Sequence, residues 1–443
     1  MNVNTKLGLF LRRVVALSAI AAAAHAANAP SIPLCPGLIV VTAISQANGD
    51  YESIKTLESV KPDAIRVKYS AESGPDLLDV GPPLRKTLVY RNVLAADLRD
   101  AKIYEQVYLE KSAETFPGTT AIGVSAAVLN ALKTKGQAEL TLSNVYSGVE
   151  LTADRNIRPN YMDYLQPGRL QRVGTGTVPM RVLVNDEPVD LPAIKAEGEF
   201  DGGDKAEFYF LDDERNPLTL AFRLGIGFVK PLDAASLEFC ETQRKKGADP
   251  MMLAKYRCDK ANGGDRDTLR VIKISYRCAG ALPPQMGGGG SPGGAAGNGA
   301  APGSAGGAGG GGAGGGGAGG ASAMEQALAK NGKVDVYSIY FSFNSDVIRE
   351  ESEPTLREIA QVMARHPDWK LRVNGHTDAI GGDAYNLTLS KKRSAAVMDA
   401  LVKRYHIDVA RLSTDGFGRA QPKDTNDTLE GRARNRRVEL MRQ

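Results

Sequence analysis

An acid and a base near the carboxyl end of the chain are spaced so that they can serve one small ligand. Asp378 follows a strand-like apolar run at 371–373, and Arg393 belongs to a stretch in which apolar residues recur at helical spacing. The end of a strand and the helix after it can face the same small volume. Asp378 would suit an ammonium group there and Arg393 a carboxylate, so we expect a pocket for a zwitterion.

Histidine is scarce, and this limits the chemistry of the rest of the chain. The four histidines are His25, His366, His376 and His406, and none lies between residues 27 and 365. Catalytic Ser-His-Asp and Cys-His arrangements and histidine zinc sites are therefore excluded from that region. We expect His376 to be a structural hydrogen-bonding residue, because no nucleophile stands beside it. The prediction is a protein without enzymatic activity, cofactor or bound metal.

The composition is that of a globular protein with more than one domain. The chain has 443 residues, of which 42% are hydrophobic and 24% charged, enough for two or three domains with their own cores. The formal net charge is only +4, so nothing indicates a nucleic-acid partner.

Residues 1–26 are typical of a secretory signal peptide. Lys6, Arg12 and Arg13 precede an apolar stretch at 14–24, and Ala24-His25-Ala26 offers a cleavage site. The apolar stretch is about half the length of roughly 20 residues that a membrane-spanning helix needs. We therefore expect export with cleavage.

The four cysteines all lie in the exported part, where structural disulfides persist. Their three possible pairings cannot be distinguished from the sequence, although the nearby trio is expected to contain one bridge. A metal site is disfavoured because no histidine is near and CxxC spacing is absent. The disulfide candidates are Cys35, Cys240, Cys258 and Cys278.

Residues 27–281 are predicted to form a mostly-β envelope domain of unknown function. One short helix is expected from a Ser125 cap to Gly136, and Pro192 favours an edge position for its strand. The expected strands lie at 37–44, 64–69, 138–142, 180–184, 189–194, 206–211, 218–224 and 269–276.

Residues 282–323 are predicted to be a flexible linker. From 287 to 320 the chain is almost only Gly and Ala, which cannot bury enough apolar surface to offset the entropy of ordering. Such a tether suits a module that must find a site on something large and fixed.

Residues 324–443 are predicted to form a compact α/β sandwich of the βαβαβ type. Apolar residues fall on one face of a helix at 354–365, and a second helix is expected from about 389 to 405. A short helix is expected at 324–330. The expected strands lie at 337–343, 370–375, 411–417 and 436–441.

Several motifs in this module, in this order, resemble the OmpA-like peptidoglycan-binding domain of Gram-negative envelope proteins. The resemblance covers residues 334–443 and implies that the module holds the diaminopimelate residue of a peptidoglycan stem peptide without covalent chemistry. It implies that Asp378 meets the ammonium group and Arg393 the carboxylate, while Asn386, Thr377, Leu387 and Arg437 line or support the pocket. The motifs are Ile339-Tyr340-Phe341-Ser342-Phe343-Asn344-Ser345, Gly375-His376-Thr377-Asp378, Asn386-Leu387-Thr388-Leu389-Ser390 with Arg393, Gly416-Phe417-Gly418, and residues 431–439.

Two details of the last motif affect the site. Only alternate residues among Arg432, Arg434, Arg436 and Arg437 are expected to face the pocket, and Asn435 is expected to fix a turn. Outside that motif, Ser394, the residue after Arg393, stands where the family usually has Ala.

Together these observations predict a non-catalytic anchor of the periplasm, associated with the outer membrane and cell wall. Its partners would be peptidoglycan and, through the amino-terminal domain, outer-membrane or periplasmic proteins. An outer-membrane barrel or stator-type component is the alternative, disfavoured because aromatic residues make up only 6% of the chain. A wall-acting enzyme in the amino-terminal domain is a weaker alternative.

Overall fold

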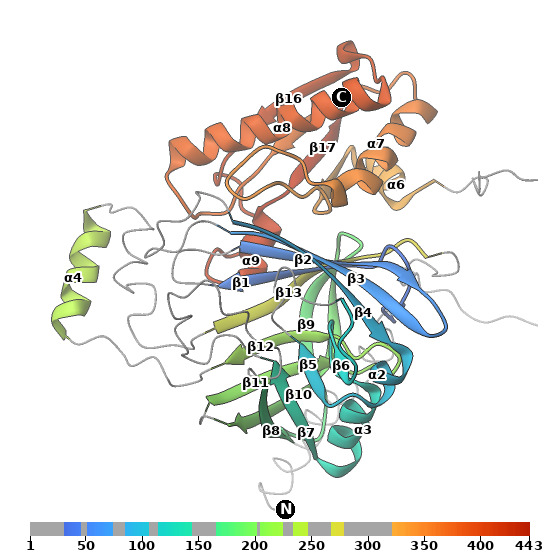
Figure 1. Ribbon diagram of the computed structural model, residues 1–443. Coiled ribbons are helices and arrows are strands. Elements are labelled where there is room, and N and C mark those ends of the chain that lie inside the picture. Colours follow the sequence, from blue (N-terminus) through green and yellow to red (C-terminus); the bar gives the residue numbers. More distant parts are fainter. Residues whose placement is uncertain are drawn as a thin grey trace, which may run out of the picture.

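The structure is a computed structural model in which two bodies pack against each other (Figure 1). It describes residues 31–45, 51–73, 85–105, 114–143, 165–201, 204–224, 234–246, 267–278 and 321–443. The described residues up to 278 are called the β domain, and residues 321–443 the carboxy-terminal module. The predicted signal peptide, the predicted linker up to residue 320 and Cys258 lie outside the described residues.

The β domain is built on one 13-stranded sheet. Its strand order is β4-β3-β2-β1-β13-β12-β11-β10-β8-β7-β5-β6, and β9 pairs with both β10 and β13. The strands are β1 (Ile39–Ser45), β2 (Tyr51–Val60), β3 (Ala64–Ser73), β4 (Arg85–Leu94), β5 (Ile103–Glu105), β6 (Thr119–Thr120), β7 (Gln137–Ser143), β8 (Leu165–Arg172), β9 (Val178–Val184), β10 (Glu187–Phe200), β11 (Asp204–Leu211), β12 (Thr219–Leu224) and β13 (Asp267–Ser275). The helices are α2 (Ala95–Asp100), α3 (Ala126–Lys135) and α4 (Ala234–Lys245).

The double pairing of β9 closes strands β9 to β13 into a ring. Buried apolar side chains from all five strands belong to one cluster, which includes Val182, Leu191, Leu211, Leu220 and Val271. A second cluster lies under α3. The mostly-β prediction for this region is therefore confirmed.

Helix α3 begins and ends where its capping residues predict. The Ser125 side chain accepts a hydrogen bond from the Val128 amide, and Gly136 adopts a left-handed conformation with φ of 71°. The predicted edge position of Pro192 is wrong for the strand as a whole, because β10 has neighbours on both sides. Pro192 lies just before Ala193, where pairing with β11 begins, and its carbonyl accepts a hydrogen bond from the Asp212 amide.

Strand β1 is buried on both faces, which explains its mainly apolar sequence. Val40 points into the core of the β domain. Ile39, Val41 and Ala43 point the other way and join a cluster that includes Leu429 and Ala433 of the carboxy-terminal module. The strand is thus shared by two hydrophobic cores.

The carboxy-terminal module is a four-stranded mixed sheet in the order β14-β17-β15-β16, with helices packed on it. Strands β15 and β16 are parallel, while β17 is antiparallel to both β14 and β15. The strands are β14 (Lys333–Val336), β15 (Leu371–Gly375), β16 (Leu412–Gly416) and β17 (Val438–Arg442). The helices are α6 (Ala323–Asn331), η3 (Glu350–Ser352), α7 (Glu353–Arg365), α8 (Asp383–Tyr405), η4 (Val409–Arg411) and α9 (Leu429–Asn435).

Two elements of the module differ from their predictions. Residues 337–343 do not form a strand; the strand of the sheet is β14, just before them. Three of their N–H groups donate to side chains instead: that of Tyr337 to Asp186, that of Tyr340 to Ser352 and that of Phe343 to Glu72. Helix α8 begins at Asp383, six residues before the predicted start, so Asn386 lies within it.

A disulfide joins Cys35 to Cys278, with their Cα atoms 6.3 Å apart, and so ties the segment before β1 to the segment after β13. Cys240 is disulfide-bonded as well. No helix in the described part of the chain is both long and apolar enough to cross a membrane.

Candidate functional site

A cavity of about 330 Å³ lies between the module and the β domain. On the module side it sits beyond the carboxyl ends of the parallel strands β15 and β16, the usual position of ligands in such sheets. On the other side it is lined by Tyr51 and Glu52 of β2, Glu72 of β3 and Lys273 of β13. Its volume is within the range of small-molecule sites.

Two glycines bring helix α8 close to these strand ends. A Cβ atom on Gly375 would lie 2.1 Å from the Ser390 carbonyl oxygen, and one on Gly416 would lie 2.4 Å from the Lys391 amide nitrogen. The Ser390 hydroxyl in turn accepts a hydrogen bond from Gly418. This close packing holds Arg393, less than one turn further along α8, over the end of the sheet.

Asp378 lies in the loop after β15 and is 7% exposed. One carboxylate oxygen accepts a bond from the Ile380 amide at 3.0 Å, and the other accepts one from Arg436 at 2.6 Å. A carboxylate has about four lone-pair sites, so Asp378 keeps the capacity to accept bonds from a ligand.

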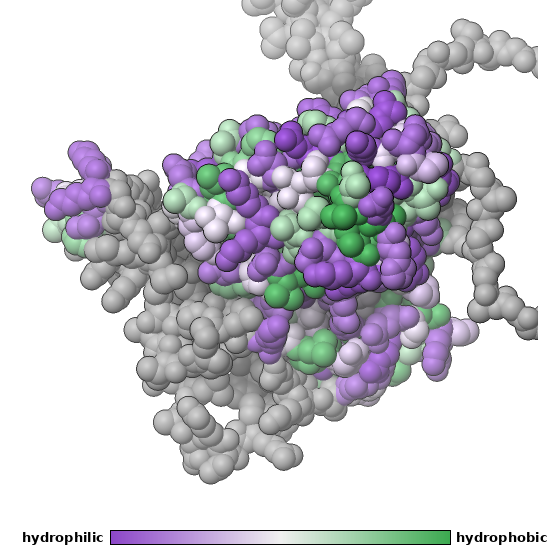
Figure 2. All heavy atoms as spheres, turned by 90° about the horizontal axis from the view of Figure 1, so that it is seen from above, coloured by the Kyte–Doolittle hydropathy of each residue, from purple (hydrophilic) through white to green (hydrophobic). Residues whose placement is uncertain are grey.

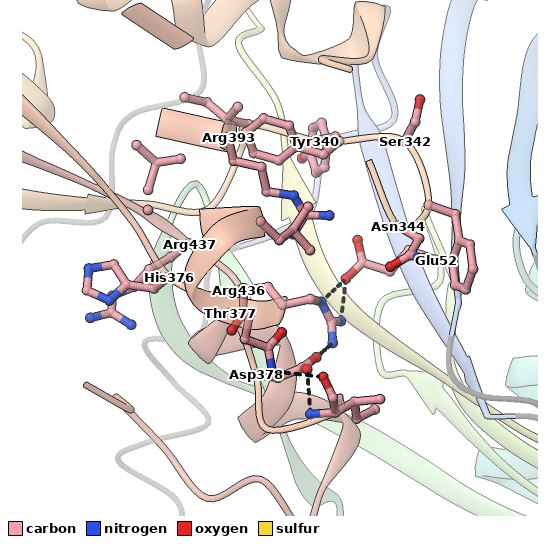
Figure 3. A pocket seen from close by; sticks show the side chains of 18 of the residues that line it. Glu52, Tyr340, Ser342, Asn344, His376, Thr377, Asp378, Arg393, Arg436 and Arg437 are labelled. Carbon is pink, nitrogen blue, oxygen red and sulfur yellow. Dashed lines mark hydrogen bonds and ion pairs between the residues drawn. The ribbon is translucent and has the colours of Figure 1, made fainter. Parts of the chain in front are cut away.

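Arg393 projects from α8 into the same cavity (Figure 3). Its Nε donates to the Ser345 carbonyl at 2.9 Å, and its guanidinium lies over the Phe341 ring at 4.9 Å. No carboxylate among the described residues forms an ion pair with it. Burial and the neighbouring Arg436 lower the pKa of Arg393 to about 10. At neutral pH the cavity therefore contains a guanidinium that lacks an anionic partner.

Arg436 and Glu52 extend the predicted acid-base pair into a network (Figure 3). Arg436 donates to Asp378 and also to Glu52, whose carboxylate lies 3.1 Å from its Nε. Burial raises the pKa of Glu52, but Lys273 and Arg436 outweigh it and lower that pKa to about 2. Glu52 could not be predicted from the sequence, because it lies more than 300 residues before the motif that contains Asp378. It also belongs to a domain in which no family pattern was recognised.

The arginine run is arranged differently from the prediction. Arg436 and Arg437 are consecutive, yet both line the cavity, because α9 ends at Asn435 and the chain turns there before β17. Arg432 and Arg434 instead bind Asn426 and Asp424.

Asn435 fixes a turn, as predicted. Its side chain accepts bonds from the amides of Lys423 and Asp424 and donates to the Asp424 carbonyl and to Asn426.

The remaining predicted site residues fall into two groups. Thr377, Asn386 and Arg437 line the cavity, whereas Leu387 is 41% exposed on α8 and is not among the lining residues. Asn386 donates to the Ile380 carbonyl and so shapes the loop that contains Asp378. The buried Thr377 hydroxyl has no hydrogen-bond partner in the described structure, so it is free for a ligand.

His376 is not the hydrogen-bonding residue that we expected. It is buried and stacked on Phe417, with ring centroids 5.3 Å apart. Neither ring nitrogen has a hydrogen-bond partner within the described ranges. Burial and the nearby Arg437 lower the pKa of His376 to about 4, so the ring is neutral at pH 7.

One side of the cavity reaches the surface. Ile380 and Tyr385 line it and are 42% and 44% exposed. Val347 and Leu387 are also exposed apolar residues of the neighbouring segments. The outer face of the module is otherwise mainly hydrophilic, with hydrophobic atoms gathered in a smaller area (Figure 2). A ligand therefore has an entrance that does not require the two bodies to separate.

The sequence of the module identifies its family. A profile of the OmpA family matches residues 340–436, which contain Asp378, Arg393 and Arg436. Residues 340–436 form an OmpA-family domain. Within this region the chain is 41% identical over 101 residues to outer membrane porin F of Pseudomonas aeruginosa, covering 23% of this chain and 29% of that protein. It is also 42% identical over 102 residues to outer membrane protein A of Bordetella avium, covering 23% of this chain and 52% of that protein.

A solved structure with a matching region is the peptidoglycan-associated lipoprotein from Burkholderia pseudomallei. It is 30% identical, and the match covers 24% of this chain and 88% of that one, with a TM-score of 0.23. The chain spans less than a third of the length of porin F. The likeness therefore concerns the OmpA-family domain.

Proposed function

We propose that this protein binds peptidoglycan non-covalently through its OmpA-family domain and anchors an exported envelope protein to the cell wall. The observation that carries the proposal is Arg393, a guanidinium without an ion-pair partner among the described residues, in the same cavity as Asp378. The ligand that fits is the diaminopimelate residue of a stem peptide, whose free end carries both an ammonium and a carboxylate group. Asp378 would bind the ammonium, Arg393 the carboxylate, and Thr377 would add a hydrogen bond.

The proposed location is the periplasm, at the outer membrane and cell wall of a Gram-negative bacterium. The positive and apolar start of the chain favours export. The names of the relatives that share the OmpA-family domain support an envelope location for this chain too. The role proposed is anchoring without catalysis, and it predicts no clearing by this protein in a peptidoglycan zymogram.

The test is co-sedimentation of the exported chain with purified peptidoglycan that contains diaminopimelate. Asp378→Ala and Arg393→Met are each expected to weaken retention at least tenfold, the size expected when a charge-assisted hydrogen bond is lost. Methionine keeps an apolar stem over Phe341, so the fold around Arg393 is preserved.

The matched controls are Asp399→Ala and Arg404→Ala, which remove an acid and a base from the exposed end of the same helix. Both should be retained like the wild type. Equal retention of all four variants would refute the proposed site.

A further inference from the structure

The β domain supplies one wall of the binding cavity, and it is firmly docked in that position. Asp186 accepts hydrogen bonds from the Tyr337 amide and the Ser338 hydroxyl, and Glu72 accepts one from the Phe343 amide. Arg270 forms an ion pair with Glu430. These polar contacts surround the apolar cluster that β1, β2 and β13 share with α9. The residues that the β domain presents to the cavity are therefore held in place.

A β-bulge directs Lys273 toward the cavity. In the pairing of β1 with β13, Val41 lies opposite Lys273 and Thr42 opposite Val271, so Ile272 is the extra residue. A bulge redirects side chains, and here both Ile272 and Lys273 face the module instead of alternating. Lys273 is 5% exposed and lies 5.5 Å from the centre of the Tyr340 ring.

The Lys273 ammonium group is only weakly neutralised. Its ion-pair partner in the described structure is Glu52, at 3.9 Å, which is beyond hydrogen-bond distance. The buried Asp186, which does not line the cavity, also attracts it but makes no ion-pair contact with it. Glu52 is already bound more closely by Arg436. Burial lowers the pKa of Lys273, as expected for a cation short of anionic contacts.

The cavity has one more positive than negative charge that a ligand can reach. Arg349, Arg437 and Glu72 also line it, but each has an ion-pair partner of its own: Glu351, Asp335 and Lys86. The rest are three cations and two carboxylates: Arg393, Arg436, Lys273, Asp378 and Glu52. A zwitterion would leave this surplus in place, whereas a ligand with one ammonium and two carboxylates would cancel it.

We propose that Lys273 of the β domain is a second carboxylate-binding residue of this site. This inference rests on the proposed function and makes it more specific. Diaminopimelate at the free carboxyl end of a stem peptide carries one ammonium and two carboxylate groups. Arg393 binds one carboxylate and Lys273 the other, so the full chain selects stems that end in diaminopimelate. Glu52 acts as a positioning residue, because it shares Arg436 with Asp378 and so fixes the Arg436 guanidinium between the two carboxylates.

The test uses two synthetic tripeptides, L-alanyl-D-isoglutamyl-meso-diaminopimelate with its terminal carboxyl group either free or converted to a carboxamide. Binding to the full exported chain is measured by calorimetry. The wild type should bind the free acid about tenfold more tightly than the amide. Lys273→Met should bind both peptides equally, with the affinity of the wild type for the amide. Lys273→Arg keeps the charge and should restore part of the preference.

Lys102→Met is the matched control, because Lys102 is an exposed lysine of the same domain, paired with Glu139. It should keep the full preference. A Lys273→Met variant that still prefers the free acid tenfold would overturn the inference, and so would one that binds the acid more tightly than the wild type, since Lys273 would then obstruct the site. If the wild type binds neither peptide better than Asp378→Ala does, the proposed function itself is wrong.

Discussion

At the scale of single residues, the site is a cluster of charges that are only partly neutralised by one another. Asp378 and Glu52 share Arg436, while Arg393 has no carboxylate partner in the described structure and Lys273 only a distant one. A buried cation without a close carboxylate lowers the stability of the fold unless another anion neutralises it. The polar residues of the cavity are therefore better suited to a bound ligand than to an empty site.

His376 gives a prediction about pH. Its pKa is about 4 in the folded protein and 6.5 in the unfolded chain, so the unfolded chain takes up a proton first as the pH falls. The folding free energy that depends on keeping His376 neutral is fully present above pH 6.5 and is lost progressively as the pH falls toward 4. At pH 5 the loss is about 2 kcal/mol. His376→Phe keeps the stack on Phe417 but cannot be protonated, so urea unfolding at pH 7.5 and 5 should show a smaller loss for the variant. Equal losses would contradict this assignment.

The residues of the site were only partly predictable. Asp378 and Arg393 could be found because both belong to local motifs, and their helix and strand have clear hydrophobic periods. Glu52 and Lys273 could not, because their position depends on the packing of one domain against another and on a bulge at Ile272. Arg436 was missed as a direct partner of Asp378 because the chain turns at the end of α9, where strand alternation does not apply.

At the scale of elements, the contact of α8 with the ends of β15 and β16 determines where Arg393 lies. Gly375→Ala would place a methyl group 2.1 Å from a backbone oxygen that cannot rotate away. We expect the free energy of unfolding to fall by about 1–3 kcal/mol or more. Peptidoglycan retention should fall as well, because α8 must shift. Urea unfolding and co-sedimentation measure the two effects.

Gly382→Ala is the matched control for this prediction. Gly382 precedes α8, has a negative φ, and a Cβ atom there would meet nothing within 4 Å. Glycine is preferred over alanine at such an N-cap position, so this variant should cost about 0.5–1 kcal/mol, less than Gly375→Ala. If both alanine variants behave alike, the close approach of helix and strand does not govern the site.

Long periodic elements were predicted well, and elements at the junction of the two bodies were not. Helix α7 and strands β15, β16 and β17 follow their predicted ranges within about two residues. The run at 337–343 has the composition of a strand, but three of its N–H groups donate to the side chains of Asp186, Ser352 and Glu72. Those partners come largely from another domain, which local sequence patterns do not reveal.

At the scale of the whole molecule, the Cys35–Cys278 disulfide closes a loop over a sequence separation of 243 residues. It joins the segments that flank the neighbouring strands β1 and β13, and β13 contributes Lys273 to the wall of the cavity. The double variant Cys35→Ser/Cys278→Ser should lower the free energy of unfolding by about 2–5 kcal/mol, mainly through the freedom gained by the unfolded chain. Urea unfolding of oxidised protein measures this. A loss below 0.5 kcal/mol would show that the bond adds nothing to the strand pairing.

The two-faced burial of β1 has a mechanical consequence. If the OmpA-family domain is bound to the cell wall, a force on it is transmitted through the domain interface to β1 and β2. Arg436 binds Glu52 there, and α9 packs on Val41 and Ala43. The load is then spread over the sheet of the β domain.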